Sequence, residues 1–135
     1  MMQEHLKNSI SFIKELGADE FKPFAFYDKH LDCIRVRIKD CSVIEERLSR
    51  IFTILKAAHP IESSGEQLVG FNIKGVRHLF EEVGLPPDGV FKLVDIISRI
   101  VEVYPDTFVK KVREEFIAVL EENEISVEMD IDQAA

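Results

Sequence analysis

The sequence predicts an α+β fold, with an N-terminal helix, a small antiparallel β-sheet of about four strands, and a C-terminal group of about three helices packed on one face. Two patterns support this prediction. Apolar and polar residues alternate over 33–39, as they do in a strand that buries one face. Apolar residues recur at helical spacing on both sides of this region. Because 135 residues suit one domain, we expect 1–135 to form a single domain.

The first expected helix covers residues 2–16. Its apolar residues form one stripe at helical spacing: Leu6, Ile10, Ile13 and Leu16. Gly17 follows at a position that suits a helix C-terminus. The expected sheet covers residues 24–75. Pro23 favours an edge position for its first strand, because proline has no backbone N–H to donate to a neighbour.

Residues 43–55 are compatible with two structures. Ser42 and Glu45 resemble a helix capping box, whereas 51–54 is a dense run of β-branched and aromatic residues. A turn-rich segment then leads into a second strand-like run at 67–73, which is the arrangement of a hairpin. We therefore interpret 43–55 as strands.

Three helices are expected over 76–123. The first, 76–83, ends at a glycine that is followed by two prolines. The second is expected to begin at Asp88 and to carry a wide apolar face. The third is expected to begin at Asp106 or Thr107, since either side chain can accept a hydrogen bond from the first turn of a helix.

The C-terminal segment 124–135 is acidic, and its alternation is compatible with a late edge strand or a disordered tail. After Arg113 the chain has eight acidic residues and no lysine or arginine, which accounts for the whole net charge of −8. A solvated helix face followed by a solubilising tail is the simpler interpretation, and an acidic docking segment for a basic protein partner is the alternative. This charge argues against nucleic-acid binding, which needs cations to neutralise phosphates.

The two cysteines, Cys33 and Cys41, do not form a disulfide framework, and on one strand they would be too far apart to be bridged. Free thiols in a reducing cytoplasm are therefore expected. Structural thiols are favoured over nucleophiles, because no spacing of cysteine, histidine and acid typical of a catalytic site is present. With no signal peptide and no membrane-spanning run, we expect a cytoplasmic protein that binds no membrane.

A pattern within the expected sheet resembles a known family. Tyr27 and Asp28 precede the strand pattern at 34–38, and Leu-Val-Gly-Phe-Asn-Ile follows at 68–73. This order is similar to a family of small uncharacterised β-meander domains, in which a Tyr-Asp turn opens the meander and a Val-Gly-hydrophobic strand closes it. The similarity covers about residues 24–75. It implies a meander and no particular catalytic activity.

Three polar residues at alternate positions form a candidate metal site. In an extended segment, Asp28, His30 and Asp32 share one face and offer one imidazole and two carboxylates to a divalent metal. A fourth ligand would have to come from His59 or His78 through folding. The simpler interpretation is a polar turn, since aspartate favours turns.

Three cations on one strand face form a candidate anion site. Arg35, Arg37 and Lys39 are positioned to receive an anionic ligand such as a phosphate. The competing interpretation is cross-strand pairing with Glu45 and Glu46.

The second C-terminal helix is expected to be apolar on more than one side. A helix of this kind is deeply buried or lies at an interface, so we expect a homodimer through this helix or its neighbour. The candidate interface residues are Phe91, Val94, Ile97 and Val101.

No set of residues in the sequence converges on a recognisable catalytic motif. The leading hypothesis is a non-enzymatic interaction or regulatory module that needs no cofactor. The alternative is a small metal-dependent or anion-binding enzyme that uses Asp28, His30 and Asp32. A pocket where these residues meet would favour the enzyme, and an exposed turn would favour the interaction module.

Overall fold

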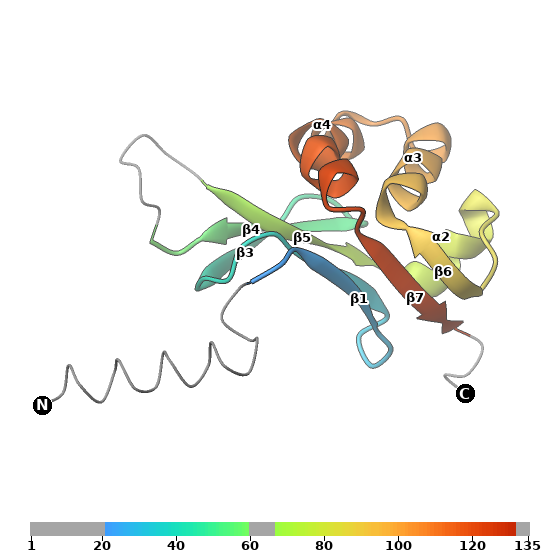
Figure 1. Cartoon of the computed structure of the whole chain (residues 1–135). Coiled ribbons are helices and arrows are strands. Elements are labelled where there is room, and N and C mark those ends of the chain that lie inside the picture. Colours follow the sequence, from blue (N-terminus) through green and yellow to red (C-terminus); the bar gives the residue numbers. More distant parts are fainter. Residues whose placement is uncertain (1–20, 60–66, 132–135) are drawn as a thin grey trace, which may run out of the picture.

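The computed structural model describes residues 21–59 and 67–131, and these residues form two antiparallel sheets and three helices (Figure 1). The helix expected over 2–16 lies outside the described residues. No helix in the described part of the chain is both long and apolar enough to cross a membrane.

The larger sheet, sheet A, has five strands in the spatial order β1-β2-β5-β4-β3. Two hairpins form its sides, and the last strand inserts between them. The strands are β1 (Phe24–Asp28), β2 (Cys33–Arg37), β3 (Val43–Arg47), β4 (Phe52–Ala57) and β5 (Leu68–Lys74). Because β5 is central, it is paired on both sides, by β2 and by β4.

The helices and a second sheet follow in the C-terminal half. Sheet B consists of one antiparallel pair, β6 and β7. The elements are α2 (Val76–Val83), β6 (Asp88–Lys92), α3 (Leu93–Val103), α4 (Thr107–Glu122) and β7 (Ser126–Asp130). Figure 1 shows α3 and α4 over one face of sheet A, with β7 running beside β1.

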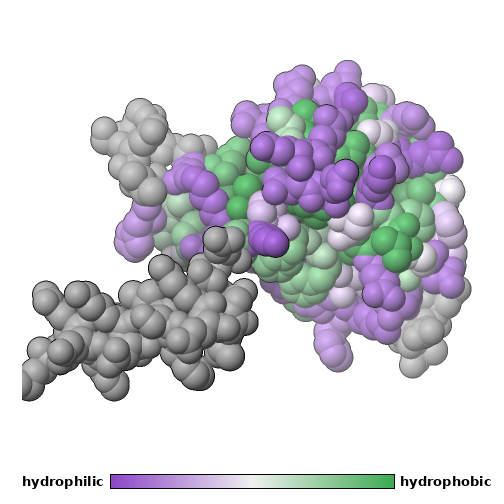
Figure 2. All heavy atoms as spheres, in the orientation of Figure 1, coloured by the Kyte–Doolittle hydropathy of each residue, from purple (hydrophilic) through white to green (hydrophobic). Residues whose placement is uncertain are grey.

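The core lies between the helices and sheet A. Phe71, at the centre of β5, is fully buried, and its ring centroid lies 4.8 Å from that of Phe116 on α4 and 6.1 Å from that of Phe52 on β4. The helices bury an apolar stripe and expose polar residues on the other side, which is why their outer surface in Figure 2 is largely hydrophilic. The helices therefore cover one face of sheet A, and β7, which pairs with β6, lies beside the edge strand β1.

The predicted fold class was wrong in its architecture. Sheet A has five strands rather than about four, and a second sheet is present that was not expected. The C-terminal helices are also not one uninterrupted group, because β6 separates α2 from α3 and β7 follows α4.

The expected second helix begins later than predicted. Val90 and Phe91 fit its apolar spacing, but they belong to β6, and the helix begins at Leu93. Gly89 has φ 126°, which is incompatible with a helix. The acidic segment supplies the partner of this strand, because residues 126–130 pair with β6.

Several local predictions were confirmed. Residues 43–55 contain strands, since β3 and the start of β4 lie there, and β4 pairs with β5 as a hairpin. Helix α2 has the expected bounds. Helix α4 is capped by Asp106, whose Oδ1 accepts a hydrogen bond from the backbone N–H of Val109 at 2.8 Å.

Candidate functional site

The turn between β1 and β2 is held by the first predicted metal ligand, Asp28. Its Oδ1 accepts backbone hydrogen bonds from His30 at 3.1 Å and Leu31 at 3.2 Å. Its Oδ2 lies 3.3 Å from Nε of Arg35. The Leu31 N–H, together with Arg35, lowers the pKa of the Asp28 carboxyl. The carboxylate is therefore engaged in the turn itself.

The second predicted carboxylate, Asp32, joins this turn to helix α2. Its Oδ1 accepts a hydrogen bond from the Tyr27 hydroxyl at 2.7 Å, and its two carboxylate oxygens lie 3.2 and 3.3 Å from the backbone nitrogen of Arg77. The N-cap of α2 is Gly75, which has no side chain to cap the helix. Asp32 therefore supplies the missing cap from a distant part of the chain. Burial and the hydrogen bond to Asp32 raise the pKa of Tyr27 to about 12.

The predicted metal ligands are not brought together. Asp28 and Asp32 hold backbone groups, His30 is exposed, and Nε2 of His78 contacts Oε1 of Glu82 on α2. The described residues contain no group of three or more His, Cys, Asp or Glu side chains that could hold a metal ion. His59 is exposed beyond β4. The geometry thus matches the polar-turn interpretation.

Two of the three predicted anion ligands share the face of sheet A opposite the helices. Arg35 pairs with Asp28, and Arg37 donates through Nη1 to Oδ1 of Asn72 at 3.2 Å. Burial, followed by the neighbouring Arg35, lowers the pKa of Arg37. Lys39 lies beyond the end of β2 and is exposed.

Direct cross-strand pairing of these cations with Glu45 and Glu46 is not present, although the charge of Glu45 acts on Arg37 from a distance. It required β2 and β3 to be neighbours, but β5 and β4 lie between them. Glu46 of β3 instead forms an ion pair with Lys56 of β4.

Both cysteines are free, as expected. Cys33 is buried, and this burial raises the pKa of its thiol, so the reactive thiolate is disfavoured. Cys41 is exposed after β2.

The residues predicted for a dimer interface do not form an exposed stripe. Ile97 is fully buried in the core, whereas Val94 and Val101 are half-buried against it. Phe91 lies in β6 and packs edge-on against Phe80 at a centroid distance of 5.7 Å. The apolar character of α3 is explained by packing within one chain, and the homodimer stays a prediction.

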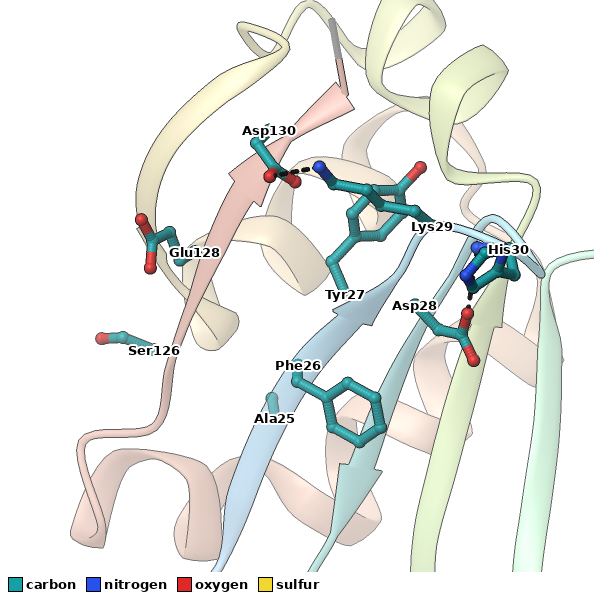
Figure 3. Close-up of a pocket in the computed structure, with 9 residues that line it drawn as sticks. All are labelled: Ala25, Phe26, Tyr27, Asp28, Lys29, His30, Ser126, Glu128 and Asp130. Atoms are coloured by element: carbon teal, nitrogen blue, oxygen red, sulfur yellow. Dashed lines mark hydrogen bonds and ion pairs between the residues drawn. The ribbon is translucent and has the colours of Figure 1, made fainter. Parts of the chain in front are cut away.

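A cleft that was not predicted separates the edge of sheet A from the edge of sheet B. It lies between β1 and β7 and has a volume of about 760 Å³ (Figure 3). At one end Lys29 reaches across to Asp130, with Nζ 2.6 Å from Oδ2. Nine residues line the cleft: Ala25, Phe26, Tyr27, Asp28, Lys29, His30, Ser126, Glu128 and Asp130.

The backbone of β1 has unpaired hydrogen-bonding groups along this cleft. The amide of Ile38 donates to Val69 on β5, so alternate residues of β2, including Arg35, direct their backbone groups toward β1. The residue opposite Arg35 is Phe26, which therefore directs its backbone N–H and C=O groups toward β2. Ala25 and Tyr27 consequently direct their N–H and C=O groups away from β2, toward the cleft.

The facing edge of β7 is open in the same way. Its pairing with β6 is fixed at both ends, where Leu93 donates to Ile125 at 2.9 Å and Ile131 donates to Pro87 at 2.9 Å. Ser126, Glu128 and Asp130 therefore direct their backbone groups away from β6. No backbone hydrogen bond joins β1 to β7 in the described residues.

In comparisons with known proteins, no family model, no curated protein and no solved structure matches the chain. The resemblance to the β-meander family therefore stays a prediction.

Proposed function

We propose that the protein is a non-enzymatic interaction module whose partner binds in the β1–β7 cleft. The observation that carries the proposal is the pair of open strand edges that face each other across this cleft. Unpaired strand edges are ready templates for another chain, and folded proteins normally cover or disrupt them. A binding function gives a reason for leaving two of them side by side.

The composition of the cleft supports binding rather than chemistry. Its carboxylates are engaged in a turn or an ion pair, except for Glu128, which projects from β7 (Figure 3). The predicted catalytic trio does not converge, so the enzyme alternative has no geometric support in the described residues. The free thiols Cys33 and Cys41 favour a reducing compartment, and we propose that the module acts in the cytoplasm.

Site-specific photo-crosslinking tests the proposal. A benzoylphenylalanine placed at Phe26, which lines the cleft and is 45% exposed, should give a discrete crosslinked species in the cells that make the protein. The matched control is the same probe at Val103, which is 44% exposed at the end of α3. Identical crosslinks at the two positions, or none at Phe26, would contradict the proposal.

A second candidate function is anion recognition at Arg35 and Arg37. The observation in its favour is that Arg35 and Arg37 lie at alternate positions of β2, where burial, followed by repulsion from Arg35, lowers the pKa of Arg37. A bound anion would relieve this repulsion. Inorganic phosphate should then raise the melting temperature of the wild type, and the shift should disappear in Arg37→Gln. A phosphate shift that survives in Arg37→Gln would place the anion elsewhere.

A further inference from the structure

We propose that the cleft takes an extended basic segment of a partner protein, which adds as a strand between β1 and β7. This inference rests on the proposed function, because it names the partner chemistry of the same cleft. Strand addition uses main-chain hydrogen bonds for affinity and alternate side chains for specificity.

The directions of the strands leave a place for one strand. Strands β1 and β7 run the same way along the cleft (Figure 3), and the Lys29–Asp130 ion pair links the ends at which both finish. A strand inserted antiparallel to both would make every neighbouring pair antiparallel across the two sheets. Antiparallel pairing is slightly more stable per residue than the parallel pairing that direct closure of β1 onto β7 would give.

The spacing requires a modest opening. Cα atoms of β1 and β7 approach within 8 Å. Two successive strand spacings need about 9.6 Å, whereas one needs about 4.8 Å. Where they approach within 8 Å, the two strands must therefore separate by at least roughly 2 Å to admit a strand. Separation would break the ion pair between Lys29 and Asp130, which acts as a latch on the cleft.

The charges around β7 select a basic occupant. Asp88 and Asp130 are directly opposite each other in sheet B, where like charges repel. Glu128 adds a third carboxylate on the same strand, and Lys29 is the cation that the cleft supplies. Lys92 lies at the other end of sheet B, opposite Ser126. Because Lys29 already bridges to Asp130, it occupies the position that a basic side chain of the partner would take.

Burial on either side of the cleft predicts an alternating occupant. Val127 and Met129 turn inward and are 1% exposed, and Ala25 of β1 packs against the same core. Glu128 and Ser126 are exposed on the other side. An inserted strand would therefore place apolar residues toward the core and basic residues toward Glu128 and Asp130.

Fluorescence anisotropy with synthetic peptides tests this inference on the full chain. The probe is a labelled peptide of about six residues that alternates lysine and valine, the length of an ordinary strand. Its matched control alternates glutamate and valine. We expect the lysine peptide to bind at least about tenfold more tightly, which corresponds to roughly 1.4 kcal/mol. Equal affinity for the two peptides would overturn the basic preference.

Backbone methylation distinguishes insertion from binding to one edge. A strand between two neighbours uses the amides of both its odd and its even residues. N-methylation of either the odd-numbered or the even-numbered amides should therefore abolish binding of the lysine peptide. A peptide bound to β1 alone, or to β7 alone, would tolerate methylation of one set, and this result would overturn insertion.

Three variants locate the binding. Glu128→Lys should weaken the lysine peptide by about tenfold, since attraction becomes repulsion. The matched control, Glu114→Lys on the exposed side of α4, should leave the affinity unchanged. Lys29→Ala removes the latch and should raise the affinity by up to about fivefold, because an exposed ion pair contributes at most roughly 1 kcal/mol. Equal effects of the two glutamate variants would exclude the cleft.

The remaining outcomes separate this inference from the proposed function. If neither peptide binds but crosslinking at Phe26 still captures a partner, strand addition by a basic segment is wrong and the interaction module stands. If crosslinking at Phe26 also fails, both are wrong. A solution mass of twice the chain by light scattering, lost on adding the lysine peptide, would assign the edges to a second copy and overturn the inference.

Discussion

Strand β5 and the β1–β7 cleft are built from the same kind of secondary structure but differ in how their edges are used. β5 is paired on both sides, and Val69, Phe71 and Ile73 are fully buried. β1 is paired on one side, and its Phe24 and Phe26 are 42% and 45% exposed. The stability of the fold is therefore concentrated around β5, whereas β1 and β7 keep unpaired backbone groups along the cleft.

The largest difference in stability between the core around β5 and the cleft is expected from substitutions at Phe71 and Phe26. Phe71→Ala should lower the free energy of unfolding by about 3–5 kcal/mol, because it removes a fully buried ring between β4 and α4. Phe26→Ala, at the exposed edge, is the control and should change stability by less than about 1 kcal/mol. Urea denaturation measures both. Similar losses at the two positions would contradict the division between core and cleft.

A close backbone approach at Gly70 gives the next largest effect. A Cβ added to Gly70 would lie 2.3 Å from the carbonyl oxygen of Val36, and this backbone atom cannot move without disturbing β2. Gly70→Ala should therefore cost about 1–3 kcal/mol. The control is Gly75→Ala, where no atom lies within 4 Å of the added Cβ. Because Gly75 has φ 63°, this control should still cost about 1 kcal/mol. A smaller loss at Gly70 than at Gly75 would show that β2 and β5 separate easily.

The cap that Asp32 provides to α2 should be worth less than the core. Asp32→Ala should lower the free energy of unfolding by about 1–2 kcal/mol, as at other helix caps, because the Arg77 amide loses its acceptor. Asp32→Asn should cost less, since asparagine also caps helices and tolerates the positive φ of 50° at this position. Thermal unfolding compares the two, and equal losses would argue against the cap.

Tyr27 should make stability depend on pH in the alkaline range. Its pKa is raised in the folded chain from 10.0 to about 12. Above pH 10 the unfolded chain therefore releases the phenolic proton first, and stability should fall as the pH rises from about 10 to 12. Tyr27→Phe should reduce this fall in stability. The control is Tyr104→Phe, which changes the other tyrosine of the chain and should leave the fall in place. The same alkaline slope in Tyr27→Phe and the wild type would exclude this role.

The smallest effect on stability is expected at the cleft. Lys29 and Asp130 have side chains that are 37% and 38% exposed, so their ion pair contributes little. Lys29→Ala should change the free energy of unfolding by less than about 1 kcal/mol while it raises affinity for the lysine peptide. Denaturation and anisotropy on the same preparation separate the two effects. A large loss of stability would make Lys29 a structural residue rather than a latch.

Local patterns in the sequence predicted the elements whose period of buried and exposed residues is regular along their whole length. The alternation over 33–39 identified β2, and the capping potential of Asp106 identified the start of α4. The resemblance of 88–103 to one helix was misleading, because apolar spacing does not distinguish β6 followed by α3 from a longer helix.

The candidate site depended on contacts that no local pattern contains. Asp32 caps a helix that begins more than forty residues later, so its role could not be separated from that of a turn residue or a metal ligand. The alternation around Val127 and Met129 did allow a strand at the acidic terminus. Its partner β6 and its place beside β1 are set by the packing of the helices.

Amide hydrogen exchange, measured residue by residue by NMR with and without the lysine peptide, tests the central claim most directly. In the free protein, the account predicts rapid exchange at Ala25 and Tyr27 and slower exchange at Phe26, which is paired with β2. The peptide should slow exchange at Ala25, Tyr27 and Glu128 together, by about tenfold or more at saturation. Slow exchange at Ala25 and Tyr27 without the peptide, or no change at these amides when it binds, would contradict the claim that the cleft holds two open strand edges for a partner.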